Sequence, residues 1–290
     1  MKLRDKNVLI TGGAGGIGSA IAREMLSAGA AVMLVDRDPE ALERTAGNLA
    51  AEPQDRLATI TCDLTDCRDL ERLRREARDW RGGVDVLINA AGVNHFGLFI
   101  KQSPAQLEQT LAINVLAPMK LCHVLLPNLL KKPEAAVLNI GSVFGSIGYP
   151  GYAAYAASKF AVRGFTESLR RELADTQVSF HCIAPRATRT GINSAAVDAM
   201  NEALGNHVDS PDAVARAVCR TLEKGRGFAV VGWPEKLFAR LNALLPGIVE
   251  RAIVRQLPLI RKCARSQGES PPGLATRMKD GSNKLRSQAT

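Results

Sequence analysis

The chain lacks the cysteine and histidine patterns of metal-binding and disulfide-linked proteins. Its six cysteines form no C-x-x-C pair, and its four histidines (His95, His123, His181 and His207) are scattered. We therefore predict no metal site. Cys62 and Cys182 fall in apolar strand patterns, where a thiol acts as a small hydrophobe. The start, Met1 to Lys6, leads straight into an apolar strand without a signal peptide, so we expect reduced thiols and a cytoplasmic location.

Aromatic residues are also scarce, at 4% of the chain. The basic residues are not interleaved with aromatics and form no recognisable nucleic-acid module, so we predict no nucleic-acid partner. What is plentiful is aliphatic sequence, since 46% of the 290 residues are hydrophobic. That is enough for one α/β domain with a large core.

Positive charge is concentrated at the C-terminal end. The formal net charge is +9, and residues 235–290 carry 11 Lys/Arg against 4 Asp/Glu, which accounts for +7 of it. We expect three parts: a catalytic dinucleotide-binding domain over 1–234, an amphipathic helical extension over 235–262, and a disordered polar tail over 263–290.

The extension reads as two short helices, broken at Pro246–Gly247 and ended by Pro258. They are too short and too charged to span a bilayer. In one interpretation they pack on the body, roof the substrate pocket or form a subunit interface. In the other they dock on an anionic membrane, which would make the cytoplasmic protein membrane-associated.

Strand-like and helical runs alternate along the body. The seven expected strands are Val8–Ile10, Ala31–Val35, Ala58–Thr61, Val84–Asn89, Ala136–Ile140, Val178–Ile183 and Phe228–Val231. This alternation predicts an α/β fold, a doubly wound, Rossmann-like parallel sheet in a single domain. Polar residues that directly follow a strand, such as Asp36, Asp63, Asn89 and Ser142, should then meet at one edge of the sheet.

A glycine-rich turn follows the first strand. It has the spacing G-x-x-x-G-x-G on Gly12, Gly16 and Gly18, and a helical pattern begins at Ile17. Glycines let the backbone approach a ligand closely, and the helix N-terminus offers N–H groups to a pyrophosphate.

The second strand ends at Asp36, 18 residues after Gly18. A carboxylate there hydrogen-bonds ribose hydroxyls and repels a 2′-phosphate, which favours NAD(H) over NADP(H). Arg37 could pair with that phosphate, so NADP(H) stays open.

Tyr155 and Lys159 are spaced i, i+4, and in a helix they share one face. A nearby ammonium favours the phenolate, so we expect it to lower the pKa of Tyr155 and prepare that group for acid–base chemistry.

With these motifs in order, residues from about 5 to 232 resemble the short-chain dehydrogenase/reductase family, in its single-domain branch. Thr11 to Gly18 is similar to the family's T-G-x-x-x-G-x-G, and Asp63-Leu64 to its adenine site. Asn89-Ala90-Ala91-Gly92 resembles N-N-A-G, with Ala90 in place of the second Asn. Asn114, Ser142, Tyr155 and Lys159 match the catalytic tetrad.

The resemblance implies a role for each tetrad residue. Tyr155 is the general acid in reduction and the base in oxidation. Lys159 depresses the Tyr155 pKa and hydrogen-bonds the nicotinamide ribose. Ser142 orients the substrate oxygen, and Asn114 holds a water for proton relay. It also implies a homodimer or homotetramer through the apolar face of the helix Lys159–Leu173.

The chain departs from the family after the sixth strand, where P-G-x-V-x-T is replaced by Pro185-Arg186-Ala187-Thr188-Arg189-Thr190. Arg186 would be strained at a positive φ. The two arginines contact pyrophosphate, an acidic substrate group or solvent. The predicted cofactor site comprises Thr11, Gly12, Gly16, Ile17, Gly18, Asp36, Arg37, Asp63, Leu64, Asn89, Ala90, Gly92, Tyr155, Lys159, Pro185, Thr188 and Thr190.

The expected substrate pocket is mostly apolar, which favours a lipophilic alcohol or ketone such as a steroid, a fatty-chain carbonyl or a terpenoid. Its predicted lining is Val93, His95, Phe96, Val143, Phe144, Tyr149 and Tyr152, covered by Ile192 and the loop to His207. His95 either bonds substrate or is structural. The predicted function is a hydride-transferring oxidoreductase. The alternatives are a non-catalytic dinucleotide-binding protein and an epimerase or dehydratase on the same scaffold.

Overall fold

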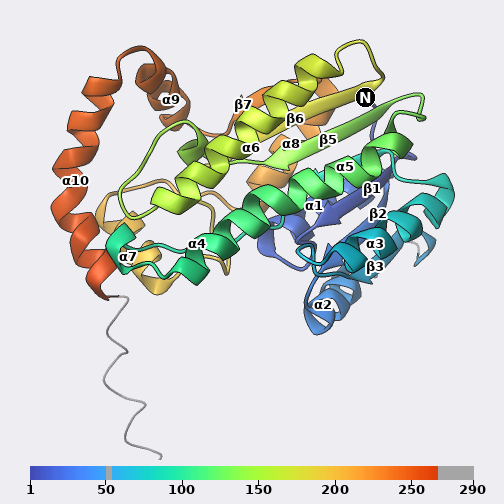
Figure 1. Cartoon of the computed structure of the whole chain (residues 1–290), viewed down its shortest axis with the longest axis horizontal. Coiled ribbons are helices and arrows are strands. Elements are labelled where there is room, and N and C mark those ends of the chain that lie inside the picture. Colours follow the sequence, from blue (N-terminus) through green and yellow to red (C-terminus); the bar gives the residue numbers. More distant parts are fainter. Residues whose placement is uncertain (50–53, 267–290) are drawn as a thin grey trace, which may run out of the picture.

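Seven strands form one parallel sheet in the computed structural model, which describes residues 1–49 and 54–266 (Figure 1). The sheet order is β3-β2-β1-β4-β5-β6-β7, and every neighbouring pair is parallel. The strands are β1 Asn7–Thr11, β2 Ala31–Asp36, β3 Leu57–Thr61, β4 Val86–Asn89, β5 Ala135–Ile140, β6 Val178–Ala184 and β7 Phe228–Val230. The predicted fold class is confirmed.

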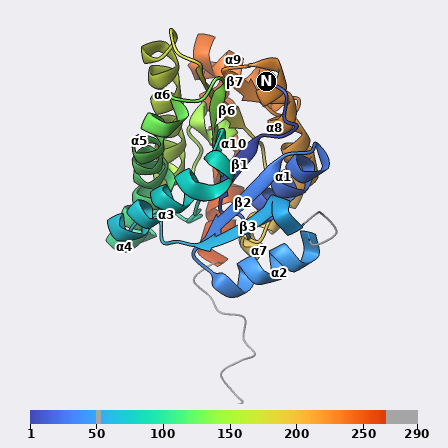
Figure 2. The ribbon, with the colours of Figure 1, turned by 90° about the vertical axis from the view of Figure 1, so that its right-hand side faces the viewer.

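Helices cover both faces of this sheet. They are α1 Gly16–Ser27, α2 Pro39–Leu49, α3 Cys67–Asp79, α4 Pro104–Leu111, α5 Ala117–Leu129, α6 Ala153–Glu172, α7 Ala195–Ala203, α8 Pro211–Lys224, α9 Glu235–Leu244 and α10 Pro246–Ser266. Figure 2 shows α1 and α8 on one side of the sheet and α5 and α6 on the other.

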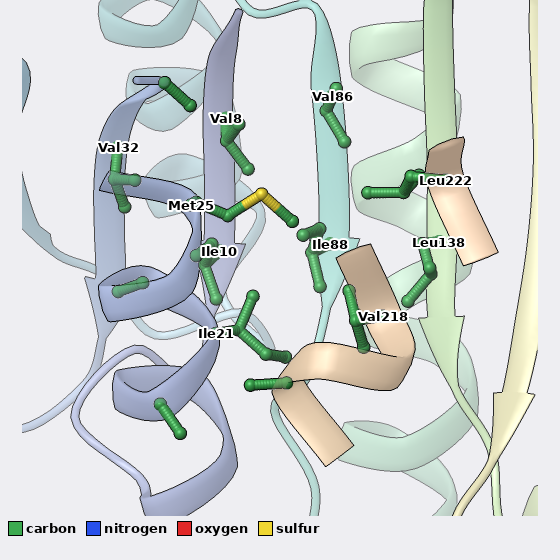
Figure 3. Packing of buried hydrophobic residues seen from close by; sticks show 14 of the residues in the cluster. Val8, Ile10, Ile21, Met25, Val32, Val86, Ile88, Leu138, Val218 and Leu222 are labelled. Carbon is green, nitrogen blue, oxygen red and sulfur yellow. The ribbon is translucent and has the colours of Figure 1, made fainter. Parts of the chain in front are cut away.

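Alternation along the strands divides the core into two layers. Val8 and Ile10 of β1 point to the face covered by α1 and α8, whereas Leu9 points to the face covered by α3 and α5. Figure 3 shows the first layer, where Ile21 and Met25 of α1 lie over strand residues that have almost no solvent exposure.

The strand order reverses at β1, which pairs with β2 on one side and with β4 on the other. Connections leaving neighbouring strands in opposite directions open a crevice at the carboxyl ends of the strands. The glycine turn after β1 and the segment after β4 both lie at this crevice, which places the predicted site there.

The C-terminal extension begins with α9 at Glu235, breaks at Leu245, and continues as α10. The expectation that Pro258 ends the second helix is wrong, because α10 runs on to Ser266. Ile260 is completely buried and packs with Val197 and Met200 from α7. Burial of this apolar turn offsets the backbone hydrogen bond that Pro258 cannot donate.

The first residues of the predicted tail, 263–266, are therefore helical, and the remainder of that tail lies outside the described residues. Within the described part of the chain, one continuous helical stretch, Pro104–Leu129, is long and apolar enough to cross a membrane. It packs in the domain, where Leu121, Cys122 and Leu125 contribute to the core.

Core packing predicts a sharp contrast between two isoleucines. Ile21 has no exposed surface, whereas Ile100 is 87% exposed. Ile21→Ala should lower the free energy of unfolding by about 2–5 kcal/mol, since it removes buried methyl groups and leaves a cavity. The matched control Ile100→Ala should change it by less than about 0.5 kcal/mol. Urea denaturation measures both, and equal effects would contradict this packing.

Candidate active site

The glycine turn has a geometry that larger residues cannot adopt. Gly12 has φ +65°, and a Cβ on it would lie 2.8 Å from the backbone of Ala91. A Cβ on Gly18 would overlap the carbonyl oxygen of Gly12. No side chain caps α1 at Gly15. The first N–H groups of this helix therefore face the crevice as an anion-binding cradle.

The carboxylate of Asp36 faces the same turn. It accepts hydrogen bonds from the backbone N–H groups of Ala14 at 3.1 Å and Arg37 at 2.8 Å. The Arg37 side chain is exposed. Asp63 follows β3 and accepts hydrogen bonds from the N–H and hydroxyl of Thr65. The two carboxylates predicted to bind the adenosine half thus lie after neighbouring strands of the sheet.

The ends of β1 and β4 are tied together across the crevice. The hydroxyl of Thr11 accepts hydrogen bonds from Ala90 and Ala91, each at 3.2 Å. The side-chain amide of Asn89 donates to Asn139 at 2.8 Å, which leaves its own carbonyl oxygen, Oδ1, buried without a partner. A buried acceptor without a donor is rare in folded proteins, and Asn94 Oδ1 and Gln102 Oε1 are further examples among the described residues.

Asn114 lies in a π-helical turn, Ala112–Leu116, between α4 and α5. Its Oδ1 accepts from the Val93 N–H at 2.8 Å, and its Nδ2 donates to the Val93 carbonyl at 2.9 Å and to Ser158 Oγ at 3.0 Å. Single π turns are typical of functional sites. This one turns Asn114 toward the segment after β4 and toward α6.

Ser142, Tyr155 and Lys159 come together at the end of β5 and the first turns of α6. Lys159 Nζ donates to the Ile140 carbonyl at 2.9 Å and lies 5.6 Å from the centroid of the Tyr155 ring. The Ser158 hydroxyl donates to the Tyr155 carbonyl at 2.6 Å and links this helix to Asn114. Four residues predicted to act together thus lie in one connected cluster.

Burial dominates the titration of this cluster. Although Tyr155 keeps some exposed surface, its deep position raises the pKa of its hydroxyl, and a side-chain hydrogen bond to Ser142 opposes this rise only in part. The same loss of water lowers the pKa of Lys159 to about 8. The expected lowering of the Tyr155 pKa by Lys159 is therefore wrong for the chain without nucleotide, because desolvation is the larger effect.

A cavity of about 360 Å³ opens beside these groups, and Ser142, Tyr155 and Lys159 line it together with Ile17 and Gly92. One wall is aromatic and adjoins Tyr155, whose ring centroid lies 6.5 Å from that of Phe144 and 6.1 Å from that of Tyr152. Phe144 stacks on Tyr149 with ring centroids 5.0 Å apart, and its ring is tilted by 43° to that of Tyr152 with centroids 4.9 Å apart. Burial raises the pKa of Tyr149 to about 12, so this wall stays neutral at physiological pH.

The structure divides the predicted substrate residues into two groups. Val143, Phe144, Tyr149 and Tyr152 line the cavity, as do Ile192, Val197 and His207 from the expected covering segment. Val93, His95 and Phe96 do not.

Each residue of the second group has another partner. The backbone of Val93 is bound to Asn114, and Phe96 packs behind Tyr152 with ring centroids 5.0 Å apart. The Nε2 atom of His95 lies 3.0 Å from Gln109 Oε1, which favours the structural interpretation of this histidine.

Six cavity residues belong to the C-terminal helices and were not named from the sequence as cavity residues: Glu235, Phe238, Val249, Ala252, Ile253 and Gln256. The Tyr149 hydroxyl donates to Gln256 Oε1 at 2.7 Å. Figure 1 shows α10 at one end of the domain, with α9 beside its beginning and α7 beside its far end. The apolar periodicity of residues 235–262 was the sequence signal that could have identified these residues, because an apolar helix face needs a surface to pack against.

The loop after β6 also differs from expectation. Among the described non-glycine residues only Asp5 and Arg81 have positive φ, so Arg186 is not strained. Its guanidinium forms ion pairs with Asp209 and Glu235 and is mostly shielded from solvent. It is therefore neither at a phosphate site nor freely solvated. Pro185 and Thr188 are buried beside the cavity, and the Thr190 methyl group lies against Gly16.

Comparison with known proteins agrees with this geometry. Residues 6–201 match the family described as short chain dehydrogenase. "Nodulation protein G" of Rhizobium sp. (strain N33) is 34% identical over 203 residues, 70% of this chain and 81% of that protein. "Dehydrogenase/reductase SDR family member 7B" of Bos taurus is 31% identical over 276 residues, 91% of this chain and 85% of that protein.

The solved structure of 3-ketoacyl-(acyl-carrier-protein) reductase from Brucella melitensis complexed with NADH has a TM-score of 0.72 and 26% identity, and the match covers 79% of this chain and 96% of that one. The chain belongs to the short-chain dehydrogenase/reductase family of oxidoreductases.

Proposed function

We propose that the chain interconverts a lipophilic ketone or aldehyde and the corresponding alcohol with NAD(H) as cofactor. The observation that carries the proposal is the convergence of Ser142, Tyr155 and Lys159 on one apolar cavity next to the glycine turn. A protein that only binds a dinucleotide has no need of a buried phenol and ammonium in that position, and this argues for catalysis.

The residues present fit a nicotinamide dinucleotide. The Gly12 turn leaves room for a pyrophosphate at the start of α1, and Asp36 stands where an adenosine ribose would be recognised. The side-chain oxygen of Asn89 is buried at the end of β4 without a hydrogen-bond partner. When bound, the nicotinamide supplies or accepts a hydride. The exposed Arg37 side chain leaves NADP(H) as a second cofactor.

The chain's own residues manage the proton. In reduction, the Tyr155 hydroxyl donates its proton to the substrate oxygen, and the raised pKa keeps that proton on Tyr155 at neutral pH. Ser142 positions the same oxygen by hydrogen bonding. Lys159, held by the Ile140 carbonyl, lies behind the Tyr155 ring, and Asn114 connects the cluster to the segment after β4. In oxidation the proton moves in the opposite direction.

The cavity favours a lipophilic substrate. Phe144, Ile147, Val197 and Ile253 supply apolar surface. The charged lining residues are Lys159, Arg186 and Glu235, and the last two pair with each other. The solved relative named as a 3-ketoacyl reductase points in the same direction, toward a carbonyl on an aliphatic chain. Among lipophilic carbonyls, we therefore favour a fatty-chain ketone over a steroid or terpenoid.

The wider organisation is also part of the proposal. A catalytic body over 1–234 carries the cover formed by 235–262, in a cytoplasmic homo-oligomer. Phe160 of α6 and Leu116, the last residue of the π turn, are each more than two-fifths exposed, and such apolar surface suits contact with a second copy.

Peripheral membrane contact would bring this enzyme to a lipophilic substrate. The turn between α9 and α10 exposes Leu244, Leu245 and Ile248. The outer face of α10 exposes Arg251, Arg255, Arg261, Lys262 and Arg265. A surface that is both apolar and cationic matches the interface of an anionic bilayer.

Replacement of Tyr155 by Phe tests the catalytic assignment. Turnover of a panel of aliphatic ketones and aldehydes should fall by about 10²–10⁴-fold, since the proton donor is lost. NADH affinity, measured by fluorescence titration, should stay within about twofold of the parent value, because this hydroxyl serves the substrate oxygen. Tyr149→Phe is the matched control, and its turnover should stay well above that of Tyr155→Phe. Undiminished turnover by Tyr155→Phe would refute the assignment.

Membrane contact predicts binding that depends on charge. The variant Arg251→Gln/Arg255→Gln/Lys262→Gln should bind vesicles of phosphatidylcholine and phosphatidylserine about 100-fold more weakly than the parent, because each exposed cation near the surface contributes to binding. A control with Arg44→Gln/Arg68→Gln/Arg220→Gln removes three exposed cations elsewhere and should bind as the parent does. Co-sedimentation measures both. Equal binding by all three proteins would contradict this contact.

A further inference from the structure

The guanidinium of Arg186 makes four hydrogen bonds. Its Nε and Nη2 donate to Oδ2 and Oδ1 of Asp209 at 3.0 and 2.8 Å, a bidentate pair. Its Nη1 donates to the Trp233 carbonyl at 2.8 Å and to Glu235 Oε2 at 3.2 Å. All three charged side chains are mostly shielded from solvent. Bidentate, shielded pairs of this kind are the stronger and more directional ones.

These contacts join three segments that are distant in sequence. Arg186 belongs to the loop Pro185–Thr190 after β6, Asp209 to the connection between α7 and α8, and Glu235 is the first residue of α9. Backbone bonds fix the first two segments together, because the Asp209 N–H donates to Ala187 at 2.8 Å and the Arg189 N–H donates to Asp209 at 2.9 Å. The Arg186 side chain then ties α9 to this pair.

Gly232 makes room for the guanidinium. It has φ +93°, and a Cβ there would lie 2.8 Å from Arg186 Nε and 3.0 Å from Cζ. A side chain at position 232 would therefore displace the charged group and strain the backbone. Gly232 thus provides both the space for the Arg186 side chain and the backbone conformation of the segment that leads into α9.

Other contacts hold the more distant parts of α9 and α10. Asn242 Nδ2 donates to the Ser146 carbonyl at 3.0 Å, Tyr149 bonds Gln256, and Val249 is buried against Val143 and Ile147. Arg186 instead holds the first turn of α9. That turn and the loop Pro185–Thr190 both line the cavity, through Glu235 and Phe238 on one side and Thr188 and Thr190 on the other.

We propose that Arg186 is a positioning residue that latches the cover formed by α9 and α10 to the loop beside the reacting groups. Only the purpose of this latch rests on the proposed function. That purpose is to hold the cavity closed around a substrate and to keep the loop ordered at the same time. It acts through Asp209 and Glu235 from its own place in the cavity wall. The arginine that replaces the glycine of the resembling family thus couples closure of the cavity to the loop.

Hydrogen–deuterium exchange tests the latch without any turnover. In Arg186→Ala, amides of residues 235–244 and 186–190 should exchange about tenfold faster than in the parent, since bonds to a charged group are lost. Arg186→Lys should give an intermediate rate, because an ammonium cannot bind Asp209 bidentately. In Glu235→Gln only residues 235–244 should exchange faster. The matched control Arg189→Ala removes the exposed neighbouring arginine and should exchange as the parent does.

Two results would overturn the proposal. One is unchanged exchange at 235–244 in Arg186→Ala. The other is a uniform increase across β1, β4 and β5, which would mean that Arg186 only stabilises the whole domain. Kinetics provide a second readout: in Arg186→Ala the KM for 2-decanone should rise about tenfold relative to that for 2-butanone, with kcat for both within about twofold. If neither ketone is turned over by the parent protein, the redox proposal fails while the exchange result still decides the latch.

Discussion

The site depends on the burial of one ammonium group. Lys159 lies under the carboxyl edge of the sheet with the Ile140 carbonyl as its hydrogen-bond acceptor, and loss of water lowers its pKa to about 8. The unfolded chain binds more protons than the folded one between this value and about 10.4, so this residue adds stability as the pH rises through that window. Below pH 8 the folded chain carries the full cost of a buried charge. Packing elsewhere in the domain must offset that cost.

That arrangement distributes the functional groups over separate elements. Tyr155 and Lys159 come from the first turns of α6. Ser142 follows β5, and Asn114 belongs to the π turn. The Ser158 side chain connects Asn114 to α6. Rigid strands and a helix position groups more precisely than a loop can. The parts of the site that come from loops and from the C-terminal helices instead shape the cavity, where Gln256 and Ile253 meet the aromatic wall.

Much of this could be predicted from local sequence. The strands, the glycine turn and the i, i+4 pair are encoded in short patterns; Asp36 ends β2, and Ser142 and Pro185 follow strands as expected. Features set by tertiary packing were missed. Pro258 does not end α10, because Ile260 is buried on α7, and His95 bonds Gln109 outside the cavity. The sign of the Tyr155 pKa shift was wrong because a sequence shows the charged neighbour but not the loss of water. The ion-pair partners of Arg186 are Asp209 and Glu235, which lie 23 and 49 residues further along the chain. The sequence around Arg186 therefore does not reveal them.

The central claim is that desolvation, more than the attraction between Tyr155 and Lys159, sets the protonation of both groups. The most direct measurement is an NMR titration of the Lys159 side chain in protein with isotope-labelled lysine, in which Lys159→Met identifies the signal. A pKa near 8 for the ligand-free protein is the expected result. A pKa that stays near the ordinary lysine value of 10.5 would show that the ammonium remains hydrated, and it would contradict the account.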